Sequence, residues 1–504
     1  MALRFSTKRA TACLKATNAS SLTNGFLRRN ASQAAAAASN LPDDIKQDIQ
    51  NEANLPNPDP SPDSATGRLV AEQAPYMVAT YARPPPMFVK GEGCYLWDEI
   101  PRFHSRYSSQ CFGALRSTNH IHSEATSKSN SSLLVTHLTA SIFQGGTLMH
   151  TSNLYHNPWT GALSQLLVEK TLQSGSMHDA HAVFICNSGS EANEAAIKFA
   201  RKAGKVVDES GQKHEIVSFH NSFHGRTMGS LSATPNPKYQ KPFAPMLPGF
   251  RYGTYNDVEA IKDLVTENTC GVIVEPIQGE GGVIVATEEF LTALAARCRE
   301  VDAVLIYDEI QCGLSRTGTF WAHAHLPKTA HPDIITTAKA LGNGFPIGAT
   351  IVNKNVSEKI KVGDHGTTFG GNPLGARIGH YIVSRLSDPE LQKDVLEKSK
   401  IFKKHFEELQ ARYPELVKEI RGRGLHLGLQ LSQDPTPIVT AARERGLLII
   451  TAGTNTLRFV PSLTITEKEI EEGFRILDQA MAVVTSPTEE PQGAQVSGEV
   501  DSPN

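Results

Sequence analysis

Short, unbroken runs of apolar residues alternate with longer helical stretches through the middle of the chain. The clearest apolar runs lie at 271–274, 303–307 and 333–337, and helical stretches such as 191–201 and 288–300 separate them. Continuous apolar runs are typical of strands that are buried on both faces, whereas half-exposed strands alternate. The pattern therefore predicts an α/β domain with a largely parallel sheet.

The pattern changes after about residue 384, where long charged helices begin. Short strand units follow at 425–431 and 456–460. We therefore predict two domains. A large domain spans 146–383, and a smaller α+β domain is formed by 384–485 together with an N-terminal segment at 41–145.

The two ends of the chain differ in composition from the part that is expected to fold. Residues 1–42 contain no Asp or Glu but carry six Lys or Arg residues among many Ala, Ser and Thr. This composition is typical of a mitochondrial presequence, which we place at 1–40, and a disordered tail is the alternative. Residues 486–504 contain no aromatic and no basic residue, and we expect them to be disordered.

Composition excludes several classes of protein. The formal net charge of −3 argues against a dedicated nucleic-acid binder. No window approaches the ~18 consecutive apolar residues that a membrane span requires, so we expect no membrane partner. The seven cysteines are scattered and never form C-x-x-C. We therefore expect neither a disulfide framework nor a metal site, in a protein of a reducing compartment.

One predicted helix has a well-specified start that could bind an anion. In the segment 187–194, Ser188 and Glu191 have the spacing of a capping box, and Gly189 allows a ligand to come close to the backbone. The free N–H groups of such a helix start suit a phosphate. An ordinary capped helix is the alternative interpretation of this motif taken alone.

Two charged residues follow buried strands, where α/β sheets place their ligands. Asp308 ends one strand, and a carboxylate there needs a cationic partner such as a protonated ring nitrogen. Lys339 follows another strand and enters a glycine-rich turn, where a lysine can form a Schiff base with a carbonyl. Together with a phosphate site, these residues meet three needs of pyridoxal phosphate.

Six motifs in fixed order make the interpretation specific. The chain resembles the class III (subgroup II) aminotransferases of fold type I over about 72–98 and 144–483. The motifs that carry this resemblance are NSGSEANEAAIKFAR, SFHGRTMGSLSAT, VEPIQGEGG, LIYDEIQCGLSRTG, TTAKALGNGFPIGA and HGTTFGGNPL. Within the family, HTSNLYHNP, CGLSRTG and LRFVPSL resemble the acetylornithine aminotransferases more closely than the ornithine or γ-aminobutyrate enzymes. The implied fold has a large domain with a mixed, mostly parallel sheet and a smaller α+β domain.

The resemblance implies pyridoxal 5′-phosphate as cofactor and assigns the catalytic residues. Lys339 would form the Schiff base and then move the proton between the substrate carbon and the cofactor. Asp308 would keep the pyridine nitrogen protonated, Gln311 would bind the phenolic oxygen, and Phe223 would stack on the ring.

The remaining cofactor contacts would hold the phosphate. Gly189 and Ser190 would bind it through backbone N–H groups, and Thr368 would reach it from the partner subunit of a homodimer. The resemblance thus implies that each active site is shared between two copies of the chain.

Four residues would bind the substrates. Arg226 and Arg458 are the candidates for substrate carboxylates, because a guanidinium binds a carboxylate through two parallel hydrogen bonds. Thr367 would also line the substrate site. Glu280 would neutralise Arg458 while an ω-amino substrate is bound and release it for glutamate.

The implied reaction is the transamination of N-acetylornithine with 2-oxoglutarate to N-acetylglutamate semialdehyde and glutamate. It is a step of arginine biosynthesis, and we expect it to take place in the mitochondrial matrix. Two alternatives stay open: another ω-aminotransferase that uses ornithine or γ-aminobutyrate, and a catalytically impaired homologue. A nicotinamide-dependent dehydrogenase is disfavoured because no G-x-G-x-x-G joins a strand to a helix near the start of the sheet.

The segment 100–143 departs from the family, although the chain matches the family on both sides of it. Residues 101–143 hold ten serines, four histidines and a single acid, Glu124, with no clean periodicity. A family-like stretch, YLDFTAGIAVNALGHSDP, is permitted by codon degeneracy if Ile100 to Ser117 are read one nucleotide late. We therefore expect a shifted reading frame and a poorly ordered segment here, and a lineage-specific insertion is the alternative.

Overall fold

A computed structural model describes residues 59–76, 84–92, 94–98, 103–105 and 146–485. The predicted presequence, the C-terminal tail and nearly all of the anomalous segment lie outside these residues. The expectations for these three segments therefore stay predictions.

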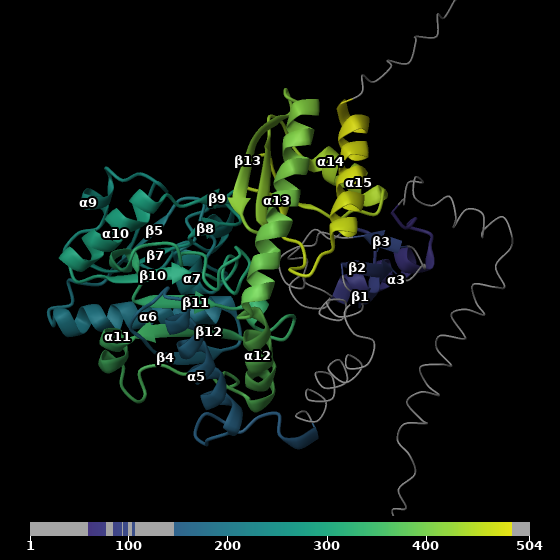
Figure 1. Cartoon of the computed structure of the whole chain (residues 1–504). Coiled ribbons are helices and arrows are strands. Elements are labelled where there is room, and N and C mark those ends of the chain that lie inside the picture. Colours follow the sequence, from purple (N-terminus) through teal and green to yellow (C-terminus); the bar gives the residue numbers. More distant parts are fainter. Residues whose placement is uncertain (1–58, 77–83, 93, 99–102, 106–145, 486–504) are drawn as a thin grey trace, which may run out of the picture. The chain divides into compact units, whose positions relative to one another are not determined.

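A seven-stranded sheet forms the centre of the larger unit (Figure 1). Neighbouring strands of this sheet run parallel, with one exception. Strand β12 runs antiparallel to both of its neighbours, β11 and β4. This mixed, mostly parallel sheet confirms the predicted fold class. In spatial order the strands are β4 (Ala180–Cys186), β12 (Gly348–Asn353), β11 (Ile334–Thr337), β10 (Val304–Asp308), β7 (Thr269–Val274), β5 (Glu215–Phe219) and β6 (Phe250–Gly253).

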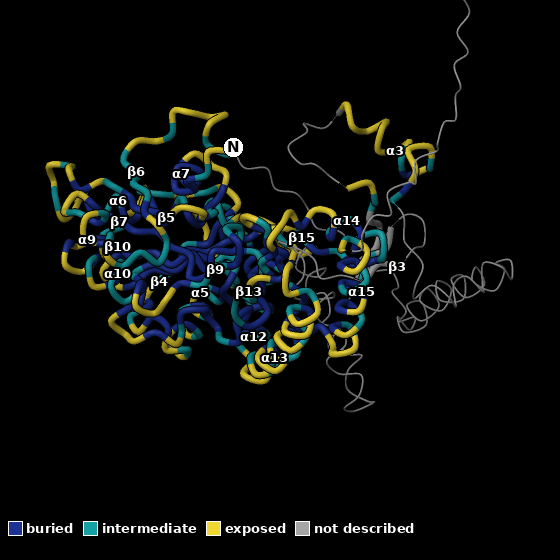
Figure 2. The backbone as a smooth tube through the Cα atoms, turned by 90° about the horizontal axis from the view of Figure 1, so that it is seen from above, coloured by how far each residue is buried: buried dark blue, intermediate teal, exposed yellow. Residues whose placement is uncertain are grey.

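Helices cover both faces of this sheet, which explains the unbroken apolar runs. On one face, Val272 and Leu305 pack in a cluster with Phe290 and Leu294 of α10 (Glu288–Glu300). On the other face, the neighbouring residues of the same strands pack with α6 (Gly189–Val207). Successive side chains along a strand point to opposite faces, so both sets are buried. Figure 2 shows these strands in dark blue.

Further helices of this unit flank the sheet or connect its strands. The longer ones are α5 (Pro158–Gln173) and α12 (Pro373–Leu386), which contact each other. The shorter ones are α7 (Met228–Ser232), α8 (Pro237–Gln240), η2 (Lys241–Phe243), α9 (Ile261–Leu264), η3 (Lys328–Ala330), η4 (Lys339–Leu341) and α11 (Lys354–Lys359).

The C-terminal part forms a smaller α+β unit around an antiparallel sheet. Its strand order is β13 (Val417–Arg423), β14 (His426–Leu431), β16 (Thr456–Phe459) and β15 (Ile450–Ala452). The helices of this part are α13 (Pro389–Arg412), α14 (Thr436–Glu444) and α15 (Glu467–Thr485). Phe402 and Phe406 of α13 pack against Phe474 of α15, in a core shared with strand β16. The predicted domain boundaries stay a prediction, because the described residues of both parts cluster together by their contacts.

Smaller elements complete the described chain. The N-terminal ones are α3 (Ala65–Gln73), η1 (Ala74–Tyr76), β1 (Phe88–Glu92), β2 (Tyr95–Asp98) and β3 (Phe103–Ser105), with β1, β2 and β3 forming a three-stranded sheet. Strands β8 (Ile277–Gln278) and β9 (Ile284–Val285) form a two-stranded hairpin. Among the described helices, none combines the length and the apolarity that crossing a membrane would require.

Candidate active site

A cavity of about 380 Å³ lies where loops follow the carboxyl ends of β4, β10 and β11. Ligands of α/β sheets bind at this edge, because loops from different strands converge there. Predicted residues from separate motifs therefore meet in one place. The lining includes Gly189, Ser190, Phe223, Gln311 and Lys339.

The start of helix α6 forms one wall of the cavity. The Ser188 hydroxyl caps the helix by accepting the backbone N–H of Glu191 at 3.2 Å. The Glu191 carboxylate turns back to accept the backbone N–H of Asn187 at 2.8 Å. A side-chain carbon on Gly189 would lie 2.9 Å from the end of the Ile310 side chain, so any larger residue here would have to displace Ile310. The predicted phosphate site thus has the local geometry of a capped helix start.

Asp308 ends strand β10 and is held by three hydrogen bonds. It is only 3% exposed. One carboxylate oxygen accepts Nδ1–H of His224 at 2.7 Å and the side-chain amide of Asn193 at 2.8 Å. The other oxygen accepts the backbone N–H of Ile310 at 3.1 Å. These contacts fix the position of the carboxylate beside the cavity.

His224 and Asn193 are functional residues that the sequence interpretation did not assign. Asn193 lies in the buried face of α6, and it also donates to the carbonyl of His224 at 2.7 Å. Both residues belong to motifs that already pointed to the site. Neither residue directly follows an apolar strand, and only the fold brings them to Asp308.

Lys339 lies at the turn that follows strand β11. It begins the short helix η4 and lines the cavity. Its backbone φ is +39°, a left-handed conformation that a lysine rarely adopts. Strained backbone of this kind gathers at functional sites, where the surrounding structure holds it in place. The structure thus places the predicted lysine at the cavity in a constrained conformation.

Phe223 and Arg226 lie in the loop after β5, and both contact the ring of Tyr239. The Phe223 backbone N–H donates to Glu275 at 2.9 Å, which fixes the start of this loop. Burial, and then repulsion by Asp308, raises the pKa of Glu275 well above its usual value. The Arg226 guanidinium lies 3.7 Å from the centre of the Tyr239 ring and 5.7 Å from that of Phe223. Such stacking orients a guanidinium while leaving its N–H groups available.

Arg458 and Glu280 form an ion pair from different parts of the chain. Arg458, in strand β16, is 1% exposed. Its Nη1 atom donates to Glu280 at 2.9 Å and to the side-chain oxygen of Gln311 at 3.4 Å. The smaller sheet therefore places a cation next to Gln311, which lines the cavity, and the sequence predicted a carboxylate-binding role for this arginine.

Thr367 and Thr368 are placed differently. The Thr367 hydroxyl accepts the side-chain amide of Asn187 at 3.0 Å, next to the phosphate wall. Thr368 is exposed and does not line this cavity. Five of the predicted site residues line the cavity, and Asp308, Arg226, Thr367 and Arg458 hydrogen-bond to residues that line it. Glu280 joins them through Arg458, whereas the expected role of Thr368 is in the site of a partner subunit.

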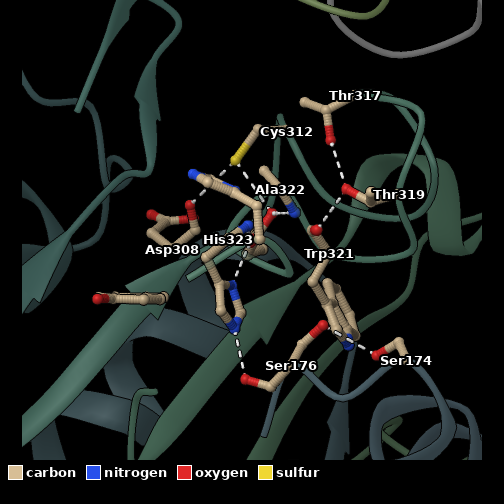
Figure 3. A network of polar contacts seen from close by, with 12 residues as sticks. Ser174, Ser176, Asp308, Cys312, Thr317, Thr319, Trp321, Ala322 and His323 are labelled. Carbon is tan, nitrogen blue, oxygen red and sulfur yellow. Dashed lines mark hydrogen bonds and ion pairs between the residues drawn. The ribbon is translucent and has the colours of Figure 1, made fainter. Parts of the chain in front are cut away.

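A second polar network, centred on Glu309, fixes the loop that carries Gln311. Figure 3 shows part of this network. Glu309 and His323 are fully buried, and they approach within 2.6 Å. The other ring nitrogen of His323 donates to the carbonyl of Ser176 at 2.9 Å. The Cys312 thiol donates to Glu309 at 3.1 Å. In the described part of the chain, no group of histidine, cysteine and acidic residues is arranged to bind a metal ion.

Comparisons with known proteins show the family of this chain. The family model described as "Aminotransferase class-III" matches residues 137–481. The mitochondrial acetylornithine aminotransferase of Neurospora crassa is 65% identical over 432 residues, which are 86% of this chain and 91% of that protein.

Two solved structures are also similar. An N-acetylornithine aminotransferase from Stenotrophomonas maltophilia has a TM-score of 0.64 and 32% identity, and the match covers 82% of this chain and 99% of that one. An ornithine aminotransferase from Toxoplasma gondii, described with partial occupancy of PLP at its active site, has a TM-score of 0.70 and 29% identity. That match covers 82% of this chain and 94% of the other.

Proposed function

The chain belongs to the class III aminotransferases, and from this premise we propose that it transfers the terminal amino group of N-acetylornithine to 2-oxoglutarate. The products are N-acetylglutamate semialdehyde and glutamate, in a step of arginine biosynthesis. The observation that carries the proposal is the ion pair between the buried Arg458 and the half-buried Glu280, next to the lining residue Gln311. Such a pair suits an enzyme whose two substrates differ in charge at this position.

The residues at the cavity fit pyridoxal phosphate. The capped start of α6 offers backbone N–H groups to a phosphate, and Asp308 offers a fixed carboxylate to a ring nitrogen. Lys339 lies at the same cavity. When bound, this cofactor supplies a carbonyl for the amino group and a ring that withdraws electrons from the reacting carbon.

Side chains of this chain would hold and move the protons of the reaction. Lys339 would move the proton between the reacting substrate carbon and the cofactor within each half-reaction. Asp308 would keep a ring proton in place, because His224 and Asn193 prevent its carboxylate from turning away. Gln311 would hold the phenolic oxygen, and Phe223 would cover one face of the ring.

Arg226 and Arg458 bind the carboxylates of the two substrates. N-acetylornithine reacts at its terminal amine and brings no carboxylate to Arg458, so Glu280 pairs with this arginine. With 2-oxoglutarate, the substrate carboxylate next to the reacting carbon replaces Glu280. Arg226 takes the distant carboxylate in both half-reactions, and Thr367 lines this part of the site.

We further propose that the enzyme is a homodimer. Exposed apolar side chains gather in two segments that a hydrogen bond from Asn153 to the Thr367 carbonyl joins at 2.7 Å. A second copy that covers them would receive Thr368 at its phosphate site. The exposed side chains in these segments are Leu148, Met149, Leu154, Tyr155 and Phe369.

The mitochondrial matrix is the proposed location. The relative from Neurospora crassa is named as mitochondrial, and the basic, acid-free segment 1–40 suits a presequence. Sequencing the N-terminus of the mitochondrial protein should find a start shortly after Arg29. Recovery of intact Met1, or of protein in the cytosol alone, would contradict this location.

Steady-state kinetics with three amino donors test the proposed substrate. N-acetylornithine should give a higher kcat/KM than ornithine or γ-aminobutyrate, with 2-oxoglutarate as the acceptor. A preference for either competing donor would instead support a sister enzyme of the same family.

A further inference from the structure

One face of the smaller sheet carries both Arg458 and a buried histidine, His426. Strands β14 and β16 are antiparallel, and Gly428 lies directly opposite Arg458. Because side chains alternate along a strand, His426 shares the face of Gly428 and lies diagonally beside Arg458. Gly428 contributes no side chain to this face.

His426 also borders the glycine turn that carries Glu280. It is 0% exposed. A side-chain carbon on Gly279 would lie 2.4 Å from the Gln311 side-chain oxygen and 3.1 Å from Nε2 of His426. The glycine thus allows the imidazole and the Gln311 amide to reach the same small region, next to the ion pair of the active site.

Several polar atoms in this region have no hydrogen-bond partner among the described residues. They are both ring nitrogens of His426 and Nε of Arg458. The contacts of the guanidinium with Glu280 and Gln311 both involve Nη1. Burying unpaired polar atoms is unfavourable, so a hydrogen bond that forms in another state of the site would explain their retention.

The imidazole is neutral in these surroundings. Burial lowers the pKa of His426 well below its usual value, and the positive charges of Arg458, Arg316 and Lys339 lower it further. A neutral imidazole has one N–H donor and one nitrogen that accepts a hydrogen bond. It can therefore accept from a guanidinium, which only donates.

We propose that His426 is a positioning residue for the half-reaction with the dicarboxylate substrate. When the substrate carboxylate displaces Glu280, the guanidinium of Arg458 shifts to bind it through two N–H groups. His426 then accepts a third N–H of the guanidinium and holds it in the orientation that binds the substrate carboxylate. This inference rests on the proposed function, and it concerns only the half-reaction in which Arg458 binds substrate.

The test measures binding of glutarate, an unreactive dicarboxylate, to the cofactor-loaded enzyme by calorimetry. His426→Leu and His426→Phe remove the acceptor, whereas His426→Gln keeps a neutral acceptor and is the matched control. Glutarate should bind about tenfold more weakly to the apolar variants, as expected for a lost hydrogen bond to a charged group, and nearly normally to the glutamine variant. The kcat/KM for N-acetylornithine, which in two separate half-reactions reports only on its own, should stay within about twofold in all three variants.

Unchanged glutarate binding in either apolar variant that keeps the wild-type melting temperature would overturn the inference. An equal loss of glutarate and N-acetylornithine binding in all three variants would also overturn it, because a purely structural role predicts that result. Failure of the wild-type enzyme to use N-acetylornithine would contradict the proposed substrate. The comparison of glutarate binding between wild type and variants would still decide the role of His426.

Discussion

At the scale of single residues, Asp308 is the group whose charge matters most. Its carboxylate is buried and fixed by His224, Asn193 and a backbone N–H. Asp308→Asn should retain some cofactor but lose most turnover, at least about 100-fold, because a neutral amide cannot hold the ring proton.

Asp333→Asn is the matched control for that change. Asp333 is a half-buried carboxylate beside the sheet, and it accepts the backbone N–H of Leu305 at 2.8 Å. Its partners Leu305 and Asn353 do not line the cavity, whereas Asp308 bonds the lining residues His224 and Ile310, so turnover should be retained in Asp333→Asn. Near wild-type kcat in Asp308→Asn would contradict the proposed role of that carboxylate.

Lys339 is the second single residue whose role can be tested, because it should be the lysine that binds the cofactor covalently. Borohydride should fix the cofactor to Lys339, and mass spectrometry should find the label on its peptide. Lys213, which is buried and donates to the carbonyl of Glu267 at 3.0 Å, should stay unlabelled. Lys339→Ala should abolish turnover, and a label on any other lysine would show that the assignment is wrong.

Sequence could predict the charged residues of the site better than the residues that support them. Asp308 and Lys339 directly follow apolar strands, so the sequence pattern locates them. His224 and Asn193 have no such signal, because Asn193 contacts residues that lie 31 and 115 positions away along the chain. His426 is similar, because its importance depends on a strand register that the sequence does not reveal.

At the scale of elements, the start of helix α6 links folding to cofactor binding. Ser188→Ala removes the hydroxyl that accepts the N–H of Glu191 and should cost about 1 kcal/mol of stability. It should also weaken cofactor binding several-fold, because the N–H groups that face the phosphate lose their fixed orientation.

Thr287→Ala provides a matched comparison at the start of helix α10. Thr287 accepts the N–H of Phe290 at 3.1 Å, which is the same type of cap at a distance from the cavity lining. Urea unfolding of both variants should show similar losses of stability, while only Ser188→Ala loses cofactor affinity. Equal cofactor affinity in the two variants would contradict a role of the α6 helix start in phosphate binding.

The strands show what an apolar pattern can and cannot establish. The pattern at 303–307 corresponds to β10, and the stretch at 288–300 to α10. The direction of β12 was not predicted, because strand direction depends on the connection. The link from β11 to β12 contains η4 but no crossover helix, so the chain returns antiparallel.

At the scale of the whole molecule, the segment 100–143 decides whether the chain as printed can be active. The family model begins its match at residue 137, after most of this segment. Transcript sequencing should show a frame that encodes the shifted, family-like peptide. A transcript that confirms the printed frame would contradict this prediction and would favour a catalytically impaired homologue.

The central claim is that the chain transfers the terminal amino group of N-acetylornithine to 2-oxoglutarate. Its most direct test is the visible absorbance of the cofactor-loaded enzyme, recorded while one substrate is added at a time. N-acetylornithine alone should remove the band of the lysine-bound cofactor, and 2-oxoglutarate should restore it. A band that N-acetylornithine leaves unchanged, or that ornithine or γ-aminobutyrate removes faster, would contradict the claim.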